Sequence, residues 1–214
     1  MLRGESPLVG LAENGAVPTV AIAIATWIAA VIGTGVAIPQ LVALVRNGGT
    51  AGLSVSGWVN GSIDYLGWVI LLAGTGAWGL LAATVPAGLL WTATTVLLLS
   101  RRDAPTAQLD RILIVGYATA LVALSVVGVT YSWWPLGAVL AVSIIWIDGP
   151  AVVELWRASD LRAVAAAGWV LAVIEGAAYA IAGWGRIPAV VYGLGAVGIT
   201  AVGLSRLVYV RRRA

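Results

Sequence analysis

Two acidic residues stand in the middle of strongly apolar stretches of this sequence, and an aromatic residue follows each of them four positions later. Asp64 precedes Trp68, and Glu175 precedes Tyr179. Residues four apart lie one turn from each other on the same face of a helix. Aromatic residues of apolar helices also pack against neighbours or face lipid, but their pairing with acids favours a binding site made of carboxylates and rings.

A carboxylate at the centre of a membrane costs about 2.5 to 3.5 kcal/mol, so such residues normally face a cavity or a partner. Asp64 and Glu175 each stand about twelve residues into their stretch, near its middle at about 1.5 Å per residue. We expect them to face each other. Two close carboxylates do not both ionise easily, so the pair is either a proton carrier or a charged site for a cationic solute.

A third acid, Asp148, lies two residues before Pro150 in another apolar stretch. A proline in a membrane helix exposes backbone groups and admits water. Asp148 is therefore a candidate for binding solute or relaying protons. A salt bridge to Arg186, or to an arginine nearer the cytoplasm, explains it equally well.

The composition is that of an integral membrane protein. Hydrophobic residues make up 61% of the 214 residues and charged residues 10%, against roughly 25% charged in a soluble domain. There is no Cys, His or Lys, which excludes thiol and histidine metal ligands and a Schiff-base cofactor. No nucleophile and base share a motif. We expect no enzyme activity, no cofactor, no metal and no nucleic-acid partner.

Seven apolar stretches are long enough to cross about 30 Å of hydrocarbon as helices. They run over residues 17–46, 52–72, 77–100, 111–130, 135–157, 163–182 and 187–210. Across seven crossings, ten of the 12 arginines fall on one side and only Arg3 and Arg186 on the other. The positive-inside rule then places the N-terminal segment 1–16 outside the cell membrane, and the loop 101–110 and basic tail 211–214 in the cytoplasm.

The two halves of the chain superimpose without gaps at a separation of 111 residues. Rare residues match at this one separation: Pro39 with Pro150, Arg46 with Arg157, Gly57 with Gly168, Trp58 with Trp169, Asp64 with Glu175, Arg101 with Arg212, and Arg102 with Arg213. This pattern predicts two three-helix repeats, residues 17–100 and 131–210. Because each repeat has three helices, directly joined repeats would lie in opposite orientations in the membrane. The linker helix 111–130 adds one crossing, so the two repeats have the same orientation.

The matched prolines are candidate hinges. Proline removes a helix hydrogen bond at a cost of about 3 kcal/mol in a soluble helix, and a membrane helix tolerates it where neighbours satisfy the freed carbonyl. Gln40, next to Pro39, offers both a donor and an acceptor for this purpose. A single proline needs no function, but Pro39 and Pro150 at equivalent places favour two halves that rock about a central site.

The stretch around Pro39 resembles the PQ-loop signature. Pro39-Gln40 is followed by Arg46, a tight turn at residues 47–49, and Gly52-Leu53-Ser54 at the start of the helix that carries Asp64. The match is strong over residues 35–72. In the second repeat, Ala151 stands in place of the Gln and residues 163–165 read Ala-Val-Ala. The 3+1+3 layout resembles the SWEET branch of this superfamily.

The resemblance implies a transporter. SWEET members carry sugars, and the position of Trp68 resembles that of a Trp lining their sugar pocket, where it would stack on a sugar or contact a cation. Lysosomal PQ-loop members carry cystine or cationic amino acids with protons. Sugar transporters place an Asn in the third helix of each repeat, where this chain has Ala82 and Gly193. Smaller residues there widen the pocket, or shift hydrogen bonding to Asp64, Glu175 and Tyr192.

The sequence thus predicts an all-α membrane protein of seven helices that moves a small polar solute by alternating access, with a sugar favoured by the architecture. Proton-coupled transport of an amino acid or another cationic solute is the alternative, favoured by the acids. A receptor or partner subunit that keeps this fold without transport is the alternative of another class.

Overall fold

The computed structural model describes residues 19–101, 108–158, 160–184 and 187–212. The predictions for segment 1–16 and for Arg3, Arg102, Arg186 and Arg213 lie outside these residues. The described chain forms nine helices and no strand. They are α1 (Thr19–Gly35), α2 (Ile38–Asn47), α3 (Val55–Gly74), α4 (Trp78–Ser100), α5 (Gln108–Thr130), α6 (Trp134–Val142), α7 (Ile144–Arg157), α8 (Ala166–Ala182) and α9 (Ile187–Arg211).

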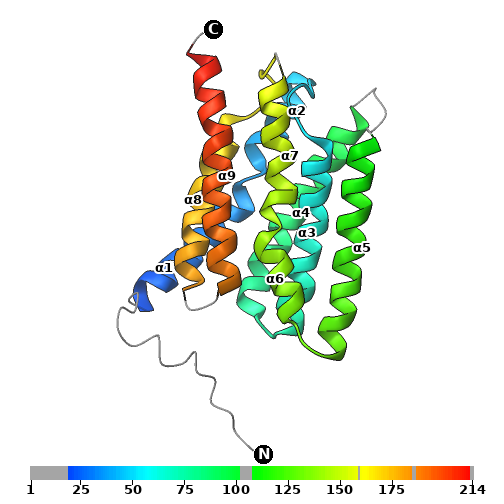
Figure 1. The fold of residues 1–214 in the computed structure, drawn as a ribbon. Helices are drawn as coiled ribbons and strands as arrows, with labels where there is room; N and C mark the ends of the chain where they lie inside the picture. Colours follow the sequence, from blue (N-terminus) through cyan, green and yellow to red (C-terminus); the bar gives the residue numbers. More distant parts are fainter. Residues whose placement is uncertain (1–18, 102–107, 159, 185–186, 213–214) are drawn as a thin grey trace, which may run out of the picture.

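These helices correspond to the seven predicted stretches, because two stretches are interrupted and form two helices each (Figure 1). Val36 and Ala37 separate α1 from α2, and Ser143 separates α6 from α7. The linker helix α5 begins at Gln108, three residues before the predicted start, which shortens the predicted loop 101–110. The helix α9 ends at Arg211, one residue beyond the predicted end.

Five helical spans are long and apolar enough to cross a membrane, as expected of a multi-pass membrane protein. They are residues 20–46, 80–100, 108–130, 134–157 and 187–211. Helices α3 and α8 are not among the five. The first carries Asn60 and Asp64, and the second has 17 residues. The two helices that carry the predicted acid pair are therefore the two stretches outside the five spans, although α8 is an apolar helix.

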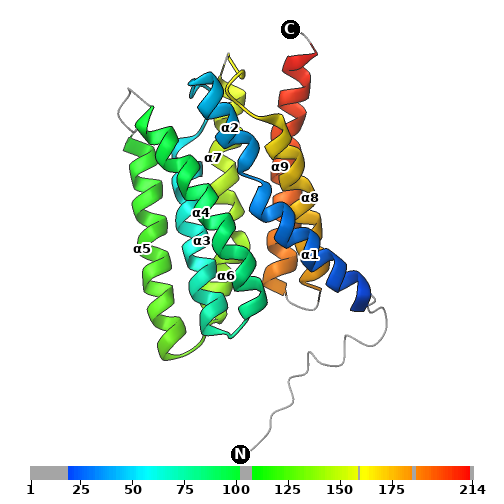
Figure 2. The same cartoon turned by 180° about the vertical axis from the view of Figure 1, so that it is seen from behind.

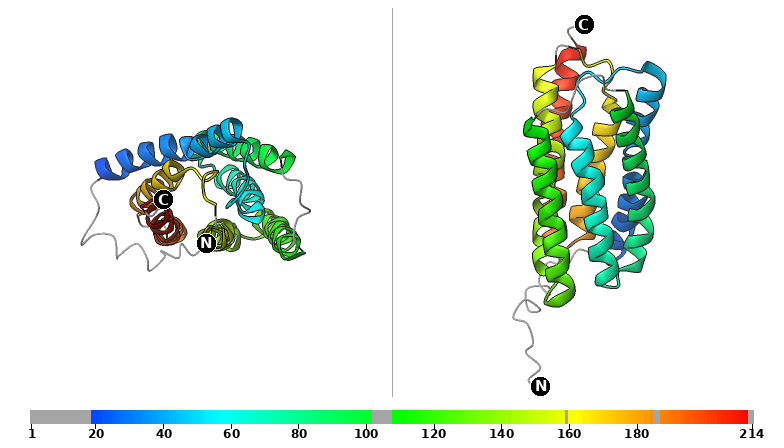
Figure 3. Two further views of the ribbon diagram at one scale, coloured as in Figure 1. Left: turned by 90° about the horizontal axis from the view of Figure 1, so that it is seen from above. Right: turned by 90° about the vertical axis from the view of Figure 1, so that its right-hand side faces the viewer.

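The helices other than α5 pack as a closed ring. Helices α1 and α2 contact α4, α4 contacts α3, α3 contacts α6 and α7, these contact α9, α9 contacts α8, and α8 returns to α1 (Figure 3). Figure 2 shows α1 lying across α8, while α2 lies beside α4. Helix α5 lies outside the ring against α3 and α6. Every contact within the first three stretches has a counterpart within the last three.

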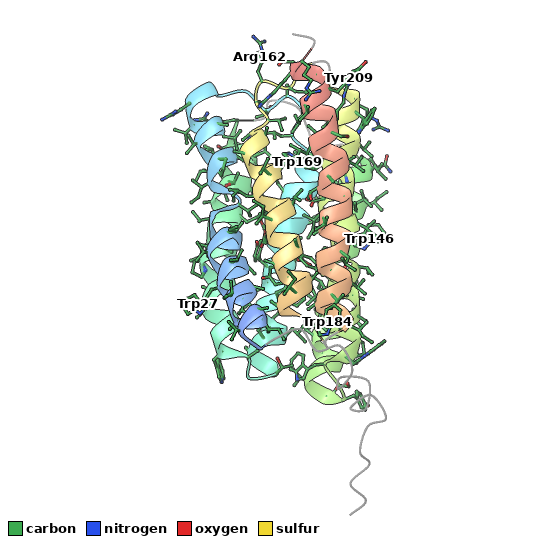
Figure 4. The ribbon with its side chains drawn as sticks, turned by 90° about the vertical axis from the view of Figure 1, so that its left-hand side faces the viewer. Trp27, Trp146, Arg162, Trp169, Trp184 and Tyr209 are labelled. Carbon is green, nitrogen blue, oxygen red and sulfur yellow. The ribbon has the colours of Figure 1, made fainter. Side chains whose placement is uncertain are left out.

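Arginine residues mark one end of the bundle, which we call the Arg-rich end. Arg46, Arg157 and Arg211 occupy the last turns of α2, α7 and α9. Figure 4 shows Arg162 and Tyr209 at this end, with Trp27 and Trp184 toward the opposite end. Leucine-rich packing fills the Arg-rich end, where Leu44, Leu53, Leu98, Leu155, Leu161 and Leu207 form one buried cluster.

The closest helix pair, α8 and α9, meets through glycines. A methyl group on Gly193 would lie 2.5 Å from the backbone oxygen of Gly176 and from the amide nitrogen of Ala180. Membrane helices gain contact area when small residues let their backbones approach. On the same helix, a methyl group on Gly198 would meet nothing within 4 Å.

We predict that Gly193→Ala lowers the free energy of unfolding by about 1–3 kcal/mol, because the added methyl group pushes two backbones apart. Gly198→Ala is the matched control and should leave it unchanged or raise it slightly. Reversible unfolding in mixed micelles measures both values. Equal stability of the two variants would contradict the close packing of α8 on α9.

Candidate functional site

A cavity of about 100 Å³ lies at the centre of the ring, between the first three and the last three stretches. Its walls come from α3, α4, α7, α8 and α9 and from the break between α1 and α2. It extends from the middle of the bundle toward Gly52 and Val164 near the Arg-rich end. The leucine cluster described above lies at that end.

All three predicted acids line this cavity. Asp64 enters from α3, Asp148 from α7 and Glu175 from α8. Asp148 thus shares one cavity with both members of the predicted acid pair. No arginine is among the lining residues, and none of the described Asp and Glu residues forms a group of three placed to hold a metal ion.

The salt bridge considered for Asp148 is not present in the part of the chain that the structure describes. The ion pair found there joins Asp160 and Arg162 in the loop before α8, at 2.8 Å. Arg186 is not a described residue. Asp148 and Glu175 also make no hydrogen bond within the described ranges, and both are half-buried. Their carboxylates are therefore available to bind a solute or a proton in the cavity.

The predicted aromatic residues form a row one turn beyond the acids. The Tyr192 ring, from α9, stands edge-on to Trp68 with ring centroids 5.6 Å apart, and edge-on to Tyr179 at 5.7 Å. Tyr192 lines the cavity, but Trp68 and Tyr179 do not. Both rings lie one turn farther from the Arg-rich end than the acids and contact the cavity through Tyr192, so a part for them in binding solute stays a prediction.

Other aromatic rings, which the sequence analysis did not single out as site residues, line the cavity instead. Trp58 and Trp91 lie with ring centroids 4.4 Å apart, and Tyr65 lies 5.8 Å from Trp91. Trp169 faces the cavity from α8. The 111-residue match of Trp58 with Trp169 was the signal in the sequence that could have identified these two rings.

The lining of the cavity follows the two halves of the sequence. Eighteen of its 25 residues form nine pairs separated by 111 positions. The pairs are Val36 with Ile147, Gln40 with Ala151, Leu53 with Val164, Ser54 with Ala165, Gly57 with Gly168, Trp58 with Trp169, Gly61 with Ala172, Asp64 with Glu175, and Tyr65 with Gly176. Equivalent positions of the two halves therefore face one shared space.

Two glycine contacts between the halves are also reciprocal. A methyl group on Gly57 would lie 2.6 Å from the carbonyl oxygen of Ile147, and one on Gly168 would lie 3.3 Å from that of Val36. Both contacts join the helix that carries the acid in one half to the proline-containing stretch of the other half. Only glycine allows the closer of these approaches.

The two candidate hinge prolines differ in their surroundings. Pro39 lies in the first turn of α2, directly after the break at Val36 and Ala37. Pro150 lies inside α7, seven residues after the break at Ser143. Because Pro150 has no N–H group, the carbonyl of Trp146 loses its helical partner, and the Asn60 side chain donates a hydrogen bond to it at 3.1 Å. Asn60 was not predicted as a site residue, although it lies one turn before Asp64.

Gln40 has different partners from those expected. Its Nε2 donates to the carbonyl of Ala163 at 2.8 Å, and its Oε1 accepts from the N–H group of Ala165 at 3.0 Å. It thus joins α2 to the start of α8 in the other half, rather than satisfying its own helix. Ala165 caps α8 without a side-chain bond, whereas Ser54 caps α3 by accepting from Gly57. Gln40 bonds the N–H group of Ala165 itself, whereas Ser54 bonds that of Gly57, whose counterpart Gly168 donates to the backbone carbonyl of Ala165.

The positions at which sugar transporters carry Asn do not face the cavity. Ala82 is exposed on α4, and Gly193 packs on the α8 backbone, where no larger side chain fits. Of the residues expected to take over hydrogen bonding, Asp64, Glu175 and Tyr192 all line the cavity. The hydroxyl of Tyr117, from α5, donates a hydrogen bond to Asp64. Tyr117 lies outside both repeats, so the comparison of halves gave no signal for it.

Comparison of the chain with protein-family models, with curated proteins and with solved structures gave no match.

We predict that Asn60→Ala lowers the free energy of unfolding by about 1–3 kcal/mol, since it leaves the Trp146 carbonyl buried without a donor. Pro150→Ala restores an N–H group at the helix position that serves this carbonyl. The double variant should then lose about 1 kcal/mol less than the sum of the single effects. Pro86→Ala, in α4, is the control for a proline that does not contact Asn60. Additive effects of Asn60→Ala and Pro150→Ala would contradict the pairing.

We predict that Gln40→Leu opens the cavity toward the Arg-rich end. Loss of two hydrogen bonds worth about 0.5–1.5 kcal/mol each shifts the closed population by roughly tenfold. The chain has no natural cysteine, so a single Ala172→Cys in the cavity wall reports access through its rate of labelling by a water-soluble maleimide. Gln108→Leu, at an exposed position on α5, is the control. An unchanged labelling rate in Gln40→Leu would show that this side chain does not hold the cavity closed.

Proposed function

We propose that this protein is a membrane carrier that moves a small polar solute by alternating access between two three-helix bundles. The first bundle comprises α1 to α4 and the second α6 to α9. The observation that carries the proposal is the lining of the central cavity by nine residue pairs separated by 111 positions. A site shared equally by two equivalent halves is the arrangement that rocking of one half against the other requires.

Contacts between the two bundles at both ends of the cavity support alternating access. The leucine cluster and Gln40 join the bundles at the Arg-rich end, and the row of Trp68, Tyr192 and Tyr179 joins them toward the opposite end. The breaks before α2 and before α7 lie beside the cavity and give each bundle a place to bend.

The resemblance to PQ-loop proteins of the SWEET type belongs to this proposal. Two observations support it: the helix contacts of the first half are repeated in the second half, and α5 lies outside the ring of the other helices. The start of α3 gives the Gly-Leu-Ser motif a physical meaning: Gly52 has a left-handed φ of 78°, Leu53 joins the leucine cluster, and Ser54 caps the helix. In the orientation that the positive-inside rule gives, the Arg-rich end lies on the cytoplasmic side of the cell membrane.

Two solute classes fit different features of the cavity. Indole and phenol rings at Trp58, Trp91, Trp169 and Tyr65 suit the flat faces of a sugar, the class that the resemblance favours. Three carboxylates with no arginine among the lining residues favour a cationic solute, or protons carried with the solute. The volume of about 100 Å³ suits a small solute in either case.

We predict that Asp64→Asn or Glu175→Gln lowers proton-driven uptake at least about tenfold, because each removes a carboxylate from the cavity. The purified protein is reconstituted in liposomes containing a pH-sensitive dye, and uptake of labelled sugars and of neutral and cationic amino acids is recorded. Acidification with one class of solute identifies proton coupling, whereas sugar equilibration without acidification identifies passive sugar transport.

Asp160→Asn is the matched control, since it also replaces an acid by its amide but lies in a loop away from the cavity. It should transport at the rate of the unaltered protein. Full proton-driven accumulation by both cavity variants would remove the acids from the mechanism. No transport of any solute class by the unaltered protein would instead favour a receptor or partner subunit.

A further inference from the structure

Helix α5 reaches the central site although it lies outside the ring. It packs against α3 and α6, and most of its surface is exposed. Three of its residues are buried, namely Tyr117, Leu121 and Gly128, and Tyr117 has 6% of its surface exposed. Its hydroxyl donates a hydrogen bond to Oδ1 of Asp64, a residue of the cavity wall.

The three cavity acids therefore have different surroundings. Asp64 is 2% exposed and accepts a hydrogen bond from the Tyr117 hydroxyl. Asp148 and Glu175 are half-buried and have no hydrogen-bond donor within the described ranges. Glu175 approaches Gly33 of α1, where a methyl group would lie 2.5 Å from its Oε1. Asp64 and Glu175 match in the sequence, but among the described residues a hydrogen-bond donor contacts the carboxylate of Asp64 only.

We infer that Tyr117 is a positioning residue of the cavity: it holds the Asp64 carboxylate in the wall and leaves Asp148 and Glu175 as the acids that meet the solute. A hydroxyl bonded to a carboxylate is a strong, short contact. Removing the donor leaves a buried acid without its partner, which is costly in an apolar surrounding. The Asp64 side chain then gains freedom to turn toward the cavity. The role of the cavity in transport rests on the proposed function.

The test uses dicyclohexylcarbodiimide, a membrane-soluble reagent for carboxyl groups in apolar surroundings, with the full-length protein in liposomes at one fixed pH. Peptide mass spectrometry quantifies modification at each acid. In the unaltered protein we expect Glu175 and Asp148 to react several-fold faster than Asp64. Tyr117→Phe should raise the Asp64 rate several-fold and leave the Glu175 rate unchanged.

An unchanged Glu175 rate also reports that the cavity of the variant is intact, which separates loss of positioning from misfolding. Tyr131→Phe is the matched control, because Tyr131 follows α5 and is 88% exposed; it should alter no rate. The inference is overturned if Asp64 reacts as fast as Glu175 in the unaltered protein, or if Tyr117→Phe leaves the Asp64 rate unchanged.

Labelling of the acids does not depend on solute flux. The experiment can therefore contradict the positioning role of Tyr117 without contradicting the proposed carrier function, and the reverse. The expected rates without transport of any tested solute would support the positioning role and count against the carrier. If the protein transports a solute but Tyr117→Phe leaves the rate of Asp64 modification unchanged, the carrier proposal is supported and the positioning role is overturned.

Discussion

The need to satisfy polar groups inside an apolar bundle governs the arrangement of this protein. In hydrocarbon, an unpaired backbone or side-chain group costs several kcal/mol. A carbonyl freed by a proline and a fully buried acid therefore each fix the place of a partner from elsewhere in the chain. Asn60 meets the carbonyl freed by Pro150, and Tyr117 meets Asp64. These contacts determine which helices must be neighbours, and apolar packing fills the space between them.

Approximate symmetry between the two halves sets the shape of the cavity but not its chemistry. The glycine contacts of Gly57 and Gly168 are reciprocal, so each half rests on the backbone of the other. Gln40 has no amide opposite it, because Ala151 occupies the equivalent position. Asp64 receives a bond from α5, which has no counterpart, while Glu175 receives none. Repeats that share a backbone have thus diverged in the polar side chains that surround the shared space.

Hydrophobic length and rare residues at one fixed separation predicted most of the helical stretches, because burial in lipid constrains composition strongly. The same reasoning brought Asp64, Glu175 and Tyr192 to one cavity. Trp68 and Tyr179 lie one turn, about 5.4 Å, farther along their helices than the acids, and they contact Tyr192 rather than the cavity itself. The same reasoning missed Tyr117: a residue outside both repeats has no match, and only the packing of α5 on α3 reveals its role.

The position of α5 limits how the proposed bundles can move. This helix contacts α3 of the first bundle and α6 of the second, so a motion that separates the bundles at this edge breaks apolar contacts on one side of it. Its buried bond to Asp64 strengthens the attachment to α3. Bending at Ser143, between α6 and α7, keeps α5, α3 and α6 together but changes the contacts of α7 with α3 and of α9 with α6. The linker therefore joins the two proposed bundles along one edge, and rocking of one bundle against the other is easiest about that edge.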